Sequence, residues 1–410
     1  MVVGGGEAES TDVLNSAEHV LEALLDADHH LAPNEIASVI ERLGRVMGAG
    51  DVTAYLVDHA QRVLAVLPGS SAEPEELDVD GTVAGRAFQT ELITHGAPVD
   101  GRTMFWVPIR DGADRLGVLK AIAPDDERTP RRLAAVASLV AAMVVARRQY
   151  GDDILLARRR QPMTLPAEMR WSMLPPLTYN GPGVSLAGTL EPAYEIAGDT
   201  FDYGVNGDAT HLAILDAMGH GLEASVMVSL AVSSYRHSRR AGLDLDEMVG
   251  AMDAAISSQF PHDRFVTAQL AILDTSTGHL RYVSAGHPAP MLVRNGRVIG
   301  DLDVEPAPPV GLGLSIPKIL SASLEPGDRL LFLSDGAIEA RSPEGELFGR
   351  NRLGGLLERA AASGLPASEV VRRLMHALLD HQQGKLQDDA TLVLLGWPDD
   401  LEHWDPLKPR

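Results

Sequence analysis

Short apolar runs bounded by turn residues dominate the C-terminal half of the chain, and stretches with helical spacing separate them. The runs predict strands over residues 184–190, 210–215, 266–273, 280–284, 291–294, 329–334 and 390–395. The helical spacing predicts helices over residues 222–239, 245–259, 353–361 and 367–381. Such a mixture predicts an α+β domain, over residues 179–399, in which two antiparallel sheets have helices outside them.

The N-terminal half has a different order of elements. Helical spacing from residue 17 to 47 is broken at Pro33-Asn34, and a short helix is predicted near 81–88. A long Ala/Val/Leu helix over about 130–148 closes the unit. Strands are predicted over residues 52–57, 62–67, 104–109 and 116–122. This pattern predicts an α/β domain over residues 15–150, preceded by a Gly-rich, acidic and disordered tail over residues 1–14.

A helical linker is predicted between the two domains, over residues 151–178. It carries the basic run Arg158-Arg159-Arg160, is interrupted at Pro162, and resumes as a helix that ends at Pro175-Pro176. The basic run has the composition of a solvated face, which is the favoured interpretation. Its alternative role is to transmit the state of the first domain to the second. Residues 400–410 form a predicted C-terminal tail.

Acidic residues stand at strand ends in four separate segments of the second domain. A turn signal at Asn206-Gly207-Asp208 predicts a hairpin that brings Asp199 close to Asp216. Taken alone, Asp216 also fits a helix N-cap. Hard cations prefer oxygen ligands, and a pair of such cations clamps a phosphate group. The segments therefore predict a hard-cation site from Asp199 with Asp202, Asp216, Asp335, and Asp388 with Asp389.

Composition narrows the classes of function. The formal net charge of -22 argues against sequence-independent nucleic-acid binding, which relies on Lys and Arg. The chain has no cysteine, so a cysteine nucleophile, thiolate metal ligands and disulfides are excluded. No signal peptide and no apolar run long enough to span a membrane is recognised. A cytoplasmic protein without a membrane or nucleic-acid partner is therefore expected.

The ordered acidic and glycine motifs resemble those of PPM-type serine/threonine phosphatases, most closely the SpoIIE/RsbU branch. The resemblance covers about residues 180–398 and implies the family's four-layer αββα sandwich, hydrolysis of phosphoserine or phosphothreonine, and two divalent cations, Mn²⁺ or Mg²⁺. The motifs that carry it are Ala197-Gly198-Asp199, Phe201-Asp202, Asp216-Ala217-Met218-Gly219-His220-Gly221, Ala285-Gly286-His287-Pro288, Ser334-Asp335-Gly336 with Glu339, and Asp388-Asp389-Ala390-Thr391.

The resemblance also implies roles for individual residues. Asp216 matches the ligand that bridges both cations, and the main-chain carbonyl of Ala217 matches the family's backbone ligand. Asp335 and Asp388 match further ligands of one cation, and Asp199 matches the remaining acidic ligand. Asp389 and Gly198 are expected to contact these ligands without binding the cations themselves.

The proton donor to the leaving oxygen is less well defined by the resemblance. The eukaryotic branch carries a histidine two residues after the bridging aspartate, where this chain has Met218. His220, His287 and a cation-bound water are the candidates, and His220 is taken with Asp216 as a catalytic residue. Neither Arg264 nor Arg281 is identified as a phosphate clamp.

The order of elements in the first domain resembles a GAF domain, which implies a sensory module that binds a small ligand or mediates dimerisation. A homodimer through the GAF domain and linker is accordingly expected. In the resembling phosphatase branch, the substrates are phosphorylated STAS-type antagonists of anti-sigma factors, which implies sigma-factor regulation by signal transduction. The alternative function is a catalytically silent signalling scaffold or a GAF ligand sensor.

Overall fold

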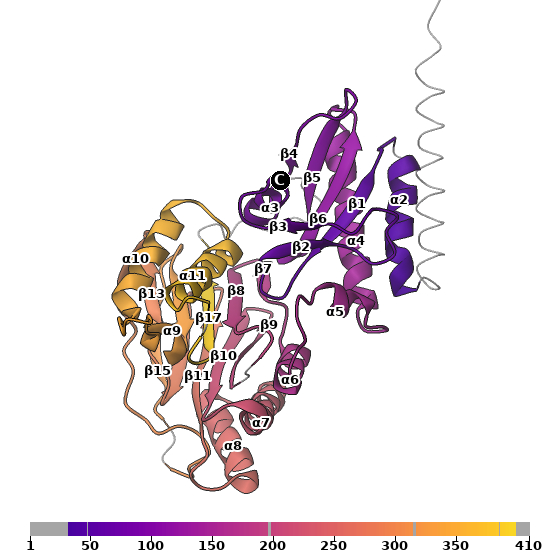
Figure 1. Ribbon diagram of the computed structural model, residues 1–410. Coiled ribbons are helices and arrows are strands. Elements are labelled where there is room, and N and C mark those ends of the chain that lie inside the picture. Colours follow the sequence, from indigo (N-terminus) through magenta and orange to yellow (C-terminus); the bar gives the residue numbers. More distant parts are fainter. Residues whose placement is uncertain (1–31, 47, 196–197, 315–316, 385, 399–410) are drawn as a thin grey trace, which may run out of the picture. The chain divides into compact units, whose positions relative to one another are not determined.

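The computed structural model describes residues 32–398, except 47, 196–197, 315–316 and 385. The predicted tails, over residues 1–14 and 400–410, and the helix predicted before Pro33 lie outside the described residues. The chain divides into two compact units, residues 1–160 and 161–410, which we call the N-unit and the C-unit. Each unit is described by itself (Figure 1).

The N-unit is built on a six-stranded antiparallel sheet with the strand order β3-β2-β1-β6-β5-β4. Its strands are β1 (Val52–Val57), β2 (Val63–Val66), β3 (Glu76–Asp78), β4 (Thr94–His95), β5 (Thr103–Asp111) and β6 (Asp114–Ala123). The short edge strands β3 and β4 escaped prediction because they have two or three residues and no apolar run.

Helices cover both faces of this sheet. The helical elements are η1 (Pro33–Glu35), α2 (Ile36–Val46), α3 (Val83–Thr90), α4 (Thr129–Arg147) and α5 (Asp153–Ala157). The apolar sides of α2 and α4 share one core with the sheet, and α3 shares another with Tyr55 and Trp106. Both cores are apolar, so this α/β unit is held together by burial on its two faces.

Helix α4 corrects one expectation from the sequence. With 19 residues and a mean hydropathy of 1.4, it is long and apolar enough to cross a membrane by length and composition. In the structure its apolar residues, among them Leu133, Val136 and Val140, are buried in the core beside α2. The core helix of a folded unit accounts for this composition.

The C-unit contains two antiparallel sheets with helices outside them. One sheet has the order β15-β12-β11-β10-β9, and the other has the order β14-β13-β16-β17-β8-β7. The strands are β7 (Thr178–Gly181), β8 (Val184–Glu191), β9 (Asp199–Asn206), β10 (Ala209–Ala217), β11 (Val266–Asp274), β12 (His279–Ala285), β13 (Met291–Arg294), β14 (Arg297–Asp301), β15 (Leu320–Ser323), β16 (Arg329–Leu333) and β17 (Ala390–Gly396).

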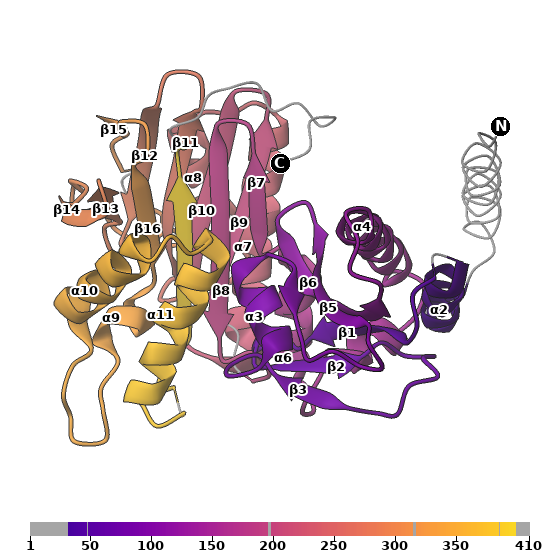
Figure 2. The ribbon, with the colours of Figure 1, turned by 90° about the horizontal axis from the view of Figure 1, so that it is seen from above.

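Three apolar cores define the layers of the C-unit (Figure 2). The first lies between the sheets, the second joins the β9–β12 sheet to α7 and α8, and the third joins the β16–β17 sheet to α10 and α11. The predicted mixed architecture, with antiparallel sheets flanked by helices, is confirmed. The helices are α6 (Leu165–Met173), α7 (Gly221–Arg240), α8 (Leu245–Gln259), α9 (Asp335–Glu339), α10 (Gly349–Ala362) and α11 (Ala367–His381).

The segment predicted as a linker contributes to both units. In the N-unit, the Arg158 guanidinium donates to the Val57 carbonyl at 2.9 Å, and Arg160 pairs with Glu76 at 3.4 Å. The interpretation of this basic run as a solvated face is therefore wrong, because half-buried arginines bind the sheet. Beyond residue 160, helix α6 belongs to the C-unit.

Candidate active site

Strands β9 and β10 form the predicted hairpin, and their register brings two of the predicted ligands together. Asp199 and Asp216 are direct cross-strand partners at its open end. Side chains alternate between the two faces of a strand, and Leu212 and Ile214 of β10 lie in the core between the sheets. By the same alternation, Asp216 points into the space between the sheets, where the apolar core ends.

Asp202, which the sequence grouped with Asp199, faces the other way. It is buried, and its carboxylate accepts hydrogen bonds from Arg236 and from Arg239 at 2.9 Å, both on α7. Asp202 lies three positions after Asp199, an odd offset, so the two side chains lie on opposite faces of β9. Asp202 therefore anchors α7 and takes no part in the acidic site.

The ends of β16 and β17 bring the other two acidic segments to the same place. The Ser334 amide donates to the Thr391 carbonyl at 3.1 Å, and the Thr391 amide donates to the Ser334 hydroxyl at 3.0 Å. Asp335 follows directly as the first residue of α9, and Asp388 and Asp389 directly precede β17. The two strand ends thus fix these carboxylates next to each other.

Gly336 has no room for a side chain. A Cβ on this residue would lie 1.9 Å from the carbonyl oxygen of Asp389, which is far inside van der Waals contact. Gly198 is also confined, since its Cβ would lie 3.1 Å from the carbonyl oxygen of Ala217 and 3.5 Å from the Asp389 carboxylate. Both glycines therefore allow the acidic segments to approach one another closely.

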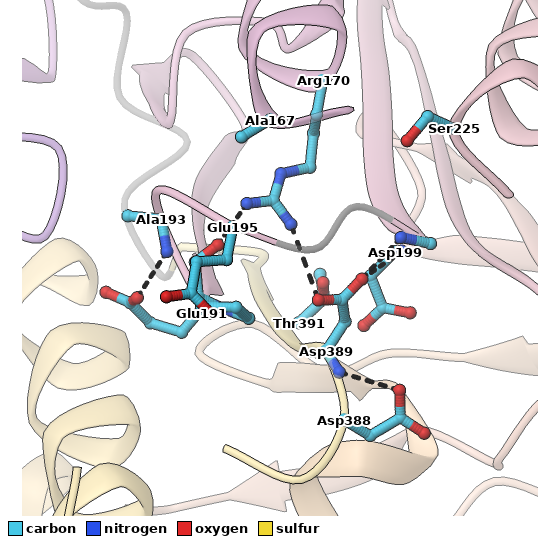
Figure 3. A network of polar contacts seen from close by, with 12 residues as sticks. Ala167, Arg170, Glu191, Ala193, Glu195, Asp199, Ser225, Asp388, Asp389 and Thr391 are labelled. Carbon is cyan, nitrogen blue, oxygen red and sulfur yellow. Dashed lines mark hydrogen bonds and ion pairs between the residues drawn. The ribbon is translucent and has the colours of Figure 1, made fainter. Parts of the chain in front are cut away.

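Asp389 supports the backbone that carries Asp199. Its Oδ2 accepts hydrogen bonds from the amides of Gly198 at 2.5 Å and of Asp199 at 3.2 Å. Its Oδ1 lies 3.9 Å from Nη1 of Arg170, which reaches it from α6 (Figure 3). Sequence reasoning did not identify Arg170, because no motif or spacing connects it with a residue more than two hundred positions later.

The electrostatics of the cluster follow from burial and from like charges. Burial, and after it the negative charges of the Asp216 and Asp389 carboxylates, raises the pKa of Asp199 well above its usual range. Burial, then Asp335 and Asp388, raise the pKa of Asp216 to about 7. Burial and then Asp388 raise the pKa of Asp335. These carboxylates therefore interact as one group, and a cation or a proton among them would relieve their repulsion.

The donor set suits a hard cation. Oδ2 of Asp199 is buried without a hydrogen-bond partner, and the carbonyl oxygens of Ala217 and Gly219 lie beside Gly198. An unsatisfied buried carboxylate oxygen is costly unless a cation or water meets it. Across the described ranges, however, no three His, Asp or Glu side chains converge closely enough to form a ready-made ion cage.

The two candidate histidines lie in different surroundings. His220 is exposed at the start of α7, four residues after Asp216. His287 is buried, its Nδ1 lies 2.8 Å from the Thr267 hydroxyl, and burial lowers its pKa to about 3. At neutral pH, His287 is therefore uncharged and unsuited to donate a proton as an imidazolium.

The two arginines near the motifs in sequence are engaged elsewhere. Arg264 donates to Glu223 at 2.8 Å, and Arg281 donates to Asp244 at 2.6 Å. These pairs agree with the sequence interpretation, which identified neither residue as a phosphate clamp.

Comparison with known families and proteins identifies the class of the C-unit. Residues 206–398 match the family described as Stage II sporulation protein E (SpoIIE). The phosphoserine phosphatase RsbU of Bacillus subtilis is 27% identical over 210 residues, which are 50% of this chain and 60% of RsbU. RsbP of the same organism is 26% identical over 192 residues, 46% of this chain and 45% of RsbP. The chain thus spans less than two thirds of the length of these relatives.

Solved structures include similar chains. The RsbU and RsbW domains of a Mycobacterium tuberculosis protein are 29% identical, with a TM-score of 0.47 over 53% of this chain and 61% of that one. The PP2C domain of SiaA from Pseudomonas aeruginosa is 20% identical, with a TM-score of 0.47 over 56% of this chain and 93% of that one.

The fold, the acidic site and the family match make the C-unit similar to PP2C-like phosphatase domains. More particularly, residues 206–398 match the SpoIIE family, and the chain is similar in sequence to RsbU and RsbP. Phosphatases of the PP2C family depend on Mg²⁺ or Mn²⁺.

Proposed function

We propose that this protein is a metal-dependent phosphatase that hydrolyses phosphoserine or phosphothreonine in a protein substrate. The observation that carries the proposal is the direct cross-strand pairing of Asp199 with Asp216 at the open end of the sandwich. Asp335 and Asp388 act on the same charge cluster, since both raise the pKa of Asp216. Four distant segments therefore contribute acidic groups to one site, as a phosphate-clamping cation site requires.

The residues that would hold two Mn²⁺ or Mg²⁺ ions are Asp199, Asp216, Asp335 and Asp388, with the carbonyl of Ala217. When bound, such ions offset the phosphate charge and activate water for attack at phosphorus. The protein's own part is to keep these oxygens in place: the β9–β10 hairpin fixes one pair, and the Ser334–Thr391 hydrogen bonds fix the other. We take His220, which is exposed at the start of α7, as the residue that would give a proton to the leaving serine oxygen.

We assign the N-unit as a GAF-like sensory domain that regulates the phosphatase through the segment 151–178. Its six-stranded antiparallel sheet, covered by helices on both faces, supports the assignment. The arginines at the end of this segment bind the N-unit sheet, whereas α6 belongs to the C-unit. A ligand-induced or dimerisation-induced change in the N-unit would thereby reach the phosphatase domain through a few intervening residues.

The proposed substrate is a phosphorylated STAS-type antagonist of an anti-sigma factor, acted on in the cytoplasm. Similarity to the phosphoserine phosphatase RsbU supports a phosphoserine substrate, and the STAS class is what the motif resemblance to the SpoIIE/RsbU branch implies. A STAS protein phosphorylated on serine should lose its phosphate in the presence of the full chain and Mn²⁺, as seen by phosphate release and intact mass. Failure with every phosphorylated STAS protein, combined with hydrolysis of other phosphoproteins, would refute the substrate while sparing the activity.

The activity itself is tested with p-nitrophenyl phosphate and Mn²⁺. The Asp216→Asn variant should lose at least about 100-fold in kcat/KM, because one acceptor at the reacting centre loses its charge. Asp208→Asn is the matched control, since this exposed aspartate lies at the closed end of the same hairpin and should leave the rate unchanged. Hydrolysis that persists without a divalent cation, or that survives in Asp216→Asn, would contradict the proposal, and a folded but inactive chain would favour a signalling scaffold.

A further inference from the structure

Arg170 is a buried cation that faces the acidic site, and it comes from α6, outside the two sheets. Its side chain has no exposed surface. Burying a guanidinium is costly unless anions and acceptors surround it. Such a residue on the last turns of a short helix therefore requires an explanation beyond helix packing.

The contacts of Arg170 lead directly to the site. Its Nη2 donates to the Pro192 carbonyl, and its Nη1 lies 3.9 Å from Oδ1 of Asp389. Asp199 and Glu191 are also close enough to act on its charge. The guanidinium thus holds the segment just before Asp199 with one nitrogen and faces the carboxylates with another (Figure 3).

Asp389 in turn is hydrogen-bonded to the backbone beside both strands of the β9–β10 hairpin. Its other oxygen accepts the amides of Gly198 and Asp199, and the Gly198 carbonyl accepts the amide of Ala217 at 3.1 Å. An unbroken series of polar contacts therefore runs from α6 through Asp389 to the backbone beside Asp199 and Asp216.

Docking of α6 does not depend on Arg170 alone. The Thr164 hydroxyl donates to the Glu195 carbonyl at 2.6 Å, and Trp171 Nε1 donates to the Ala193 carbonyl at 2.8 Å. At the other end of the helix, Arg236 donates to the Met173 carbonyl. Because these bonds fasten α6 at both ends, the charge of Arg170 is not explained by attachment of the helix.

We propose that Arg170 is a positioning residue for the phosphatase site: its charge keeps the Asp389 carboxylate turned toward the Gly198 and Asp199 amides, so that Asp199 and Asp216 are held ready for a divalent cation. The inference rests on the proposed function and adds a residue that the four-carboxylate site does not include. It also makes α6 a structural part of the acidic site. Without the guanidinium, Asp389 would be a buried anion with no cation against it and would leave this orientation.

The test is Mn²⁺ binding to the full chain by isothermal titration calorimetry, which needs no turnover. Arg170→Met, which keeps the length but removes the charge, should weaken Mn²⁺ binding about tenfold or more, as is typical when a group supporting a metal ligand is lost. Arg170→Lys should lose only about threefold, because an ammonium keeps the charge but cannot serve both partners as the guanidinium does.

Trp171→Phe is the matched control. It removes the Nε1 hydrogen bond from the same helix to the same segment but does not touch Asp389, so its Mn²⁺ affinity should stay at the wild-type value. Equal affinities in Arg170→Met and Trp171→Phe would overturn the inference, and so would equal losses in Arg170→Met and Arg170→Lys. If circular dichroism shows that Arg170→Met does not fold, Arg170→Gln takes its place, because it also removes the charge. Wild-type Mn²⁺ affinity in a folded Arg170→Gln overturns the inference.

The outcome also separates this inference from the proposed function. Arg170-dependent Mn²⁺ binding by a chain that hydrolyses no phosphate ester would refute the function and leave the positioning role standing. Hydrolysis with Arg170-independent Mn²⁺ binding would refute the positioning role alone. A wild-type chain that binds no Mn²⁺ would overturn both.

Discussion

In the sheet of the N-unit and in the layer between the two sheets of the C-unit, side chains alternate between the two faces of each strand. The two regions differ in the residues that stand at the ends of their strands. In the N-unit, both sheet faces pack into apolar cores. In the C-unit, the layer between the sheets begins as an apolar core and ends in carboxylates. Strand β10 shows the change on one face, where Leu212, Ile214 and Asp216 follow one another at every second position.

The acidic end of the C-unit layer reduces stability, because some of its buried polar atoms have no hydrogen-bond partner. At the acidic end of the C-unit layer, Oδ2 of Asp199 and Oγ1 of Thr391 are buried without a hydrogen-bond partner. Buried polar atoms of this kind oppose folding. The apolar end of the layer therefore supplies stability, and the acidic end uses part of it to hold a reactive site.

Among the substitutions that test this contrast without removing a carboxylate, the largest effect is expected at Gly336, where a Cβ would meet the Asp389 carbonyl. Gly336→Ala should lower kcat/KM with Mn²⁺ by about 10- to 100-fold, because the added Cβ would lie 1.9 Å from the Asp389 carbonyl and displace the carboxylates around it. Gly355→Ala, in helix α10 and free of close contacts, is the control and should leave the rate unchanged. Wild-type activity of Gly336→Ala would show that the close approach is not needed.

A smaller effect is expected two residues before Asp216, at the apolar end. Ile214→Val should reduce the free energy of unfolding by about 1 kcal/mol, because Ile214 is fully buried between the sheets. Its kcat/KM, measured on the folded fraction, should not change. Ile109→Val, which alters an equally buried isoleucine in the N-unit, is the matched comparison in urea unfolding. A tenfold loss of activity in Ile214→Val would mean that the two ends of the layer are not separable.

Much of this contrast could be predicted from the sequence. Apolar runs located the buried strands, and the turn at Asn206-Gly207-Asp208 set the register that pairs Asp199 with Asp216. The same period of two should have separated Asp199 from Asp202, which face opposite sides of β9. The odd spacing of Asp199 and Asp202 is visible in the sequence, but the interpretation as one acidic patch did not use it.

Other features depend on contacts that no local pattern contains. Arg170 reaches Asp389 only because α6 packs against the rest of the C-unit. The two residues are too far apart in sequence for any helix or strand periodicity to predict their contact. The lowered pKa of His287 arises from burial that a Gly-His-Pro turn does not reveal. Sequence periodicity therefore predicts which face a strand residue occupies, whereas tertiary docking decides which charges meet.

The smallest expected effect concerns a titratable group in the N-unit. His59 is 8% exposed, and burial, followed by the charges of Arg158 and Arg159, lowers its pKa to about 2. Its ordinary pKa in an unfolded chain is about 6.5, so below pH 6.5 the unfolded state binds a proton that the folded state does not. The free energy of unfolding should therefore fall as the pH falls, by about 0.7 kcal/mol between pH 7.0 and 6.0.

Urea unfolding of the full chain at these two pH values measures the difference. The N-unit transition is followed by the fluorescence of Trp106 in a background in which Trp171, Trp397 and Trp404 are replaced by Phe. His59→Gln should reduce this dependence on pH, whatever it does to stability at pH 7.0, because only the titrating group is removed. His95→Gln, which alters an exposed histidine of the same sheet, serves as the control for the substitution. If His59→Gln and the wild-type chain lose the same stability between pH 7.0 and 6.0, His59 does not titrate differently in the folded N-unit. This buried histidine would then add nothing to the contrast between the N-unit and the acidic C-unit site.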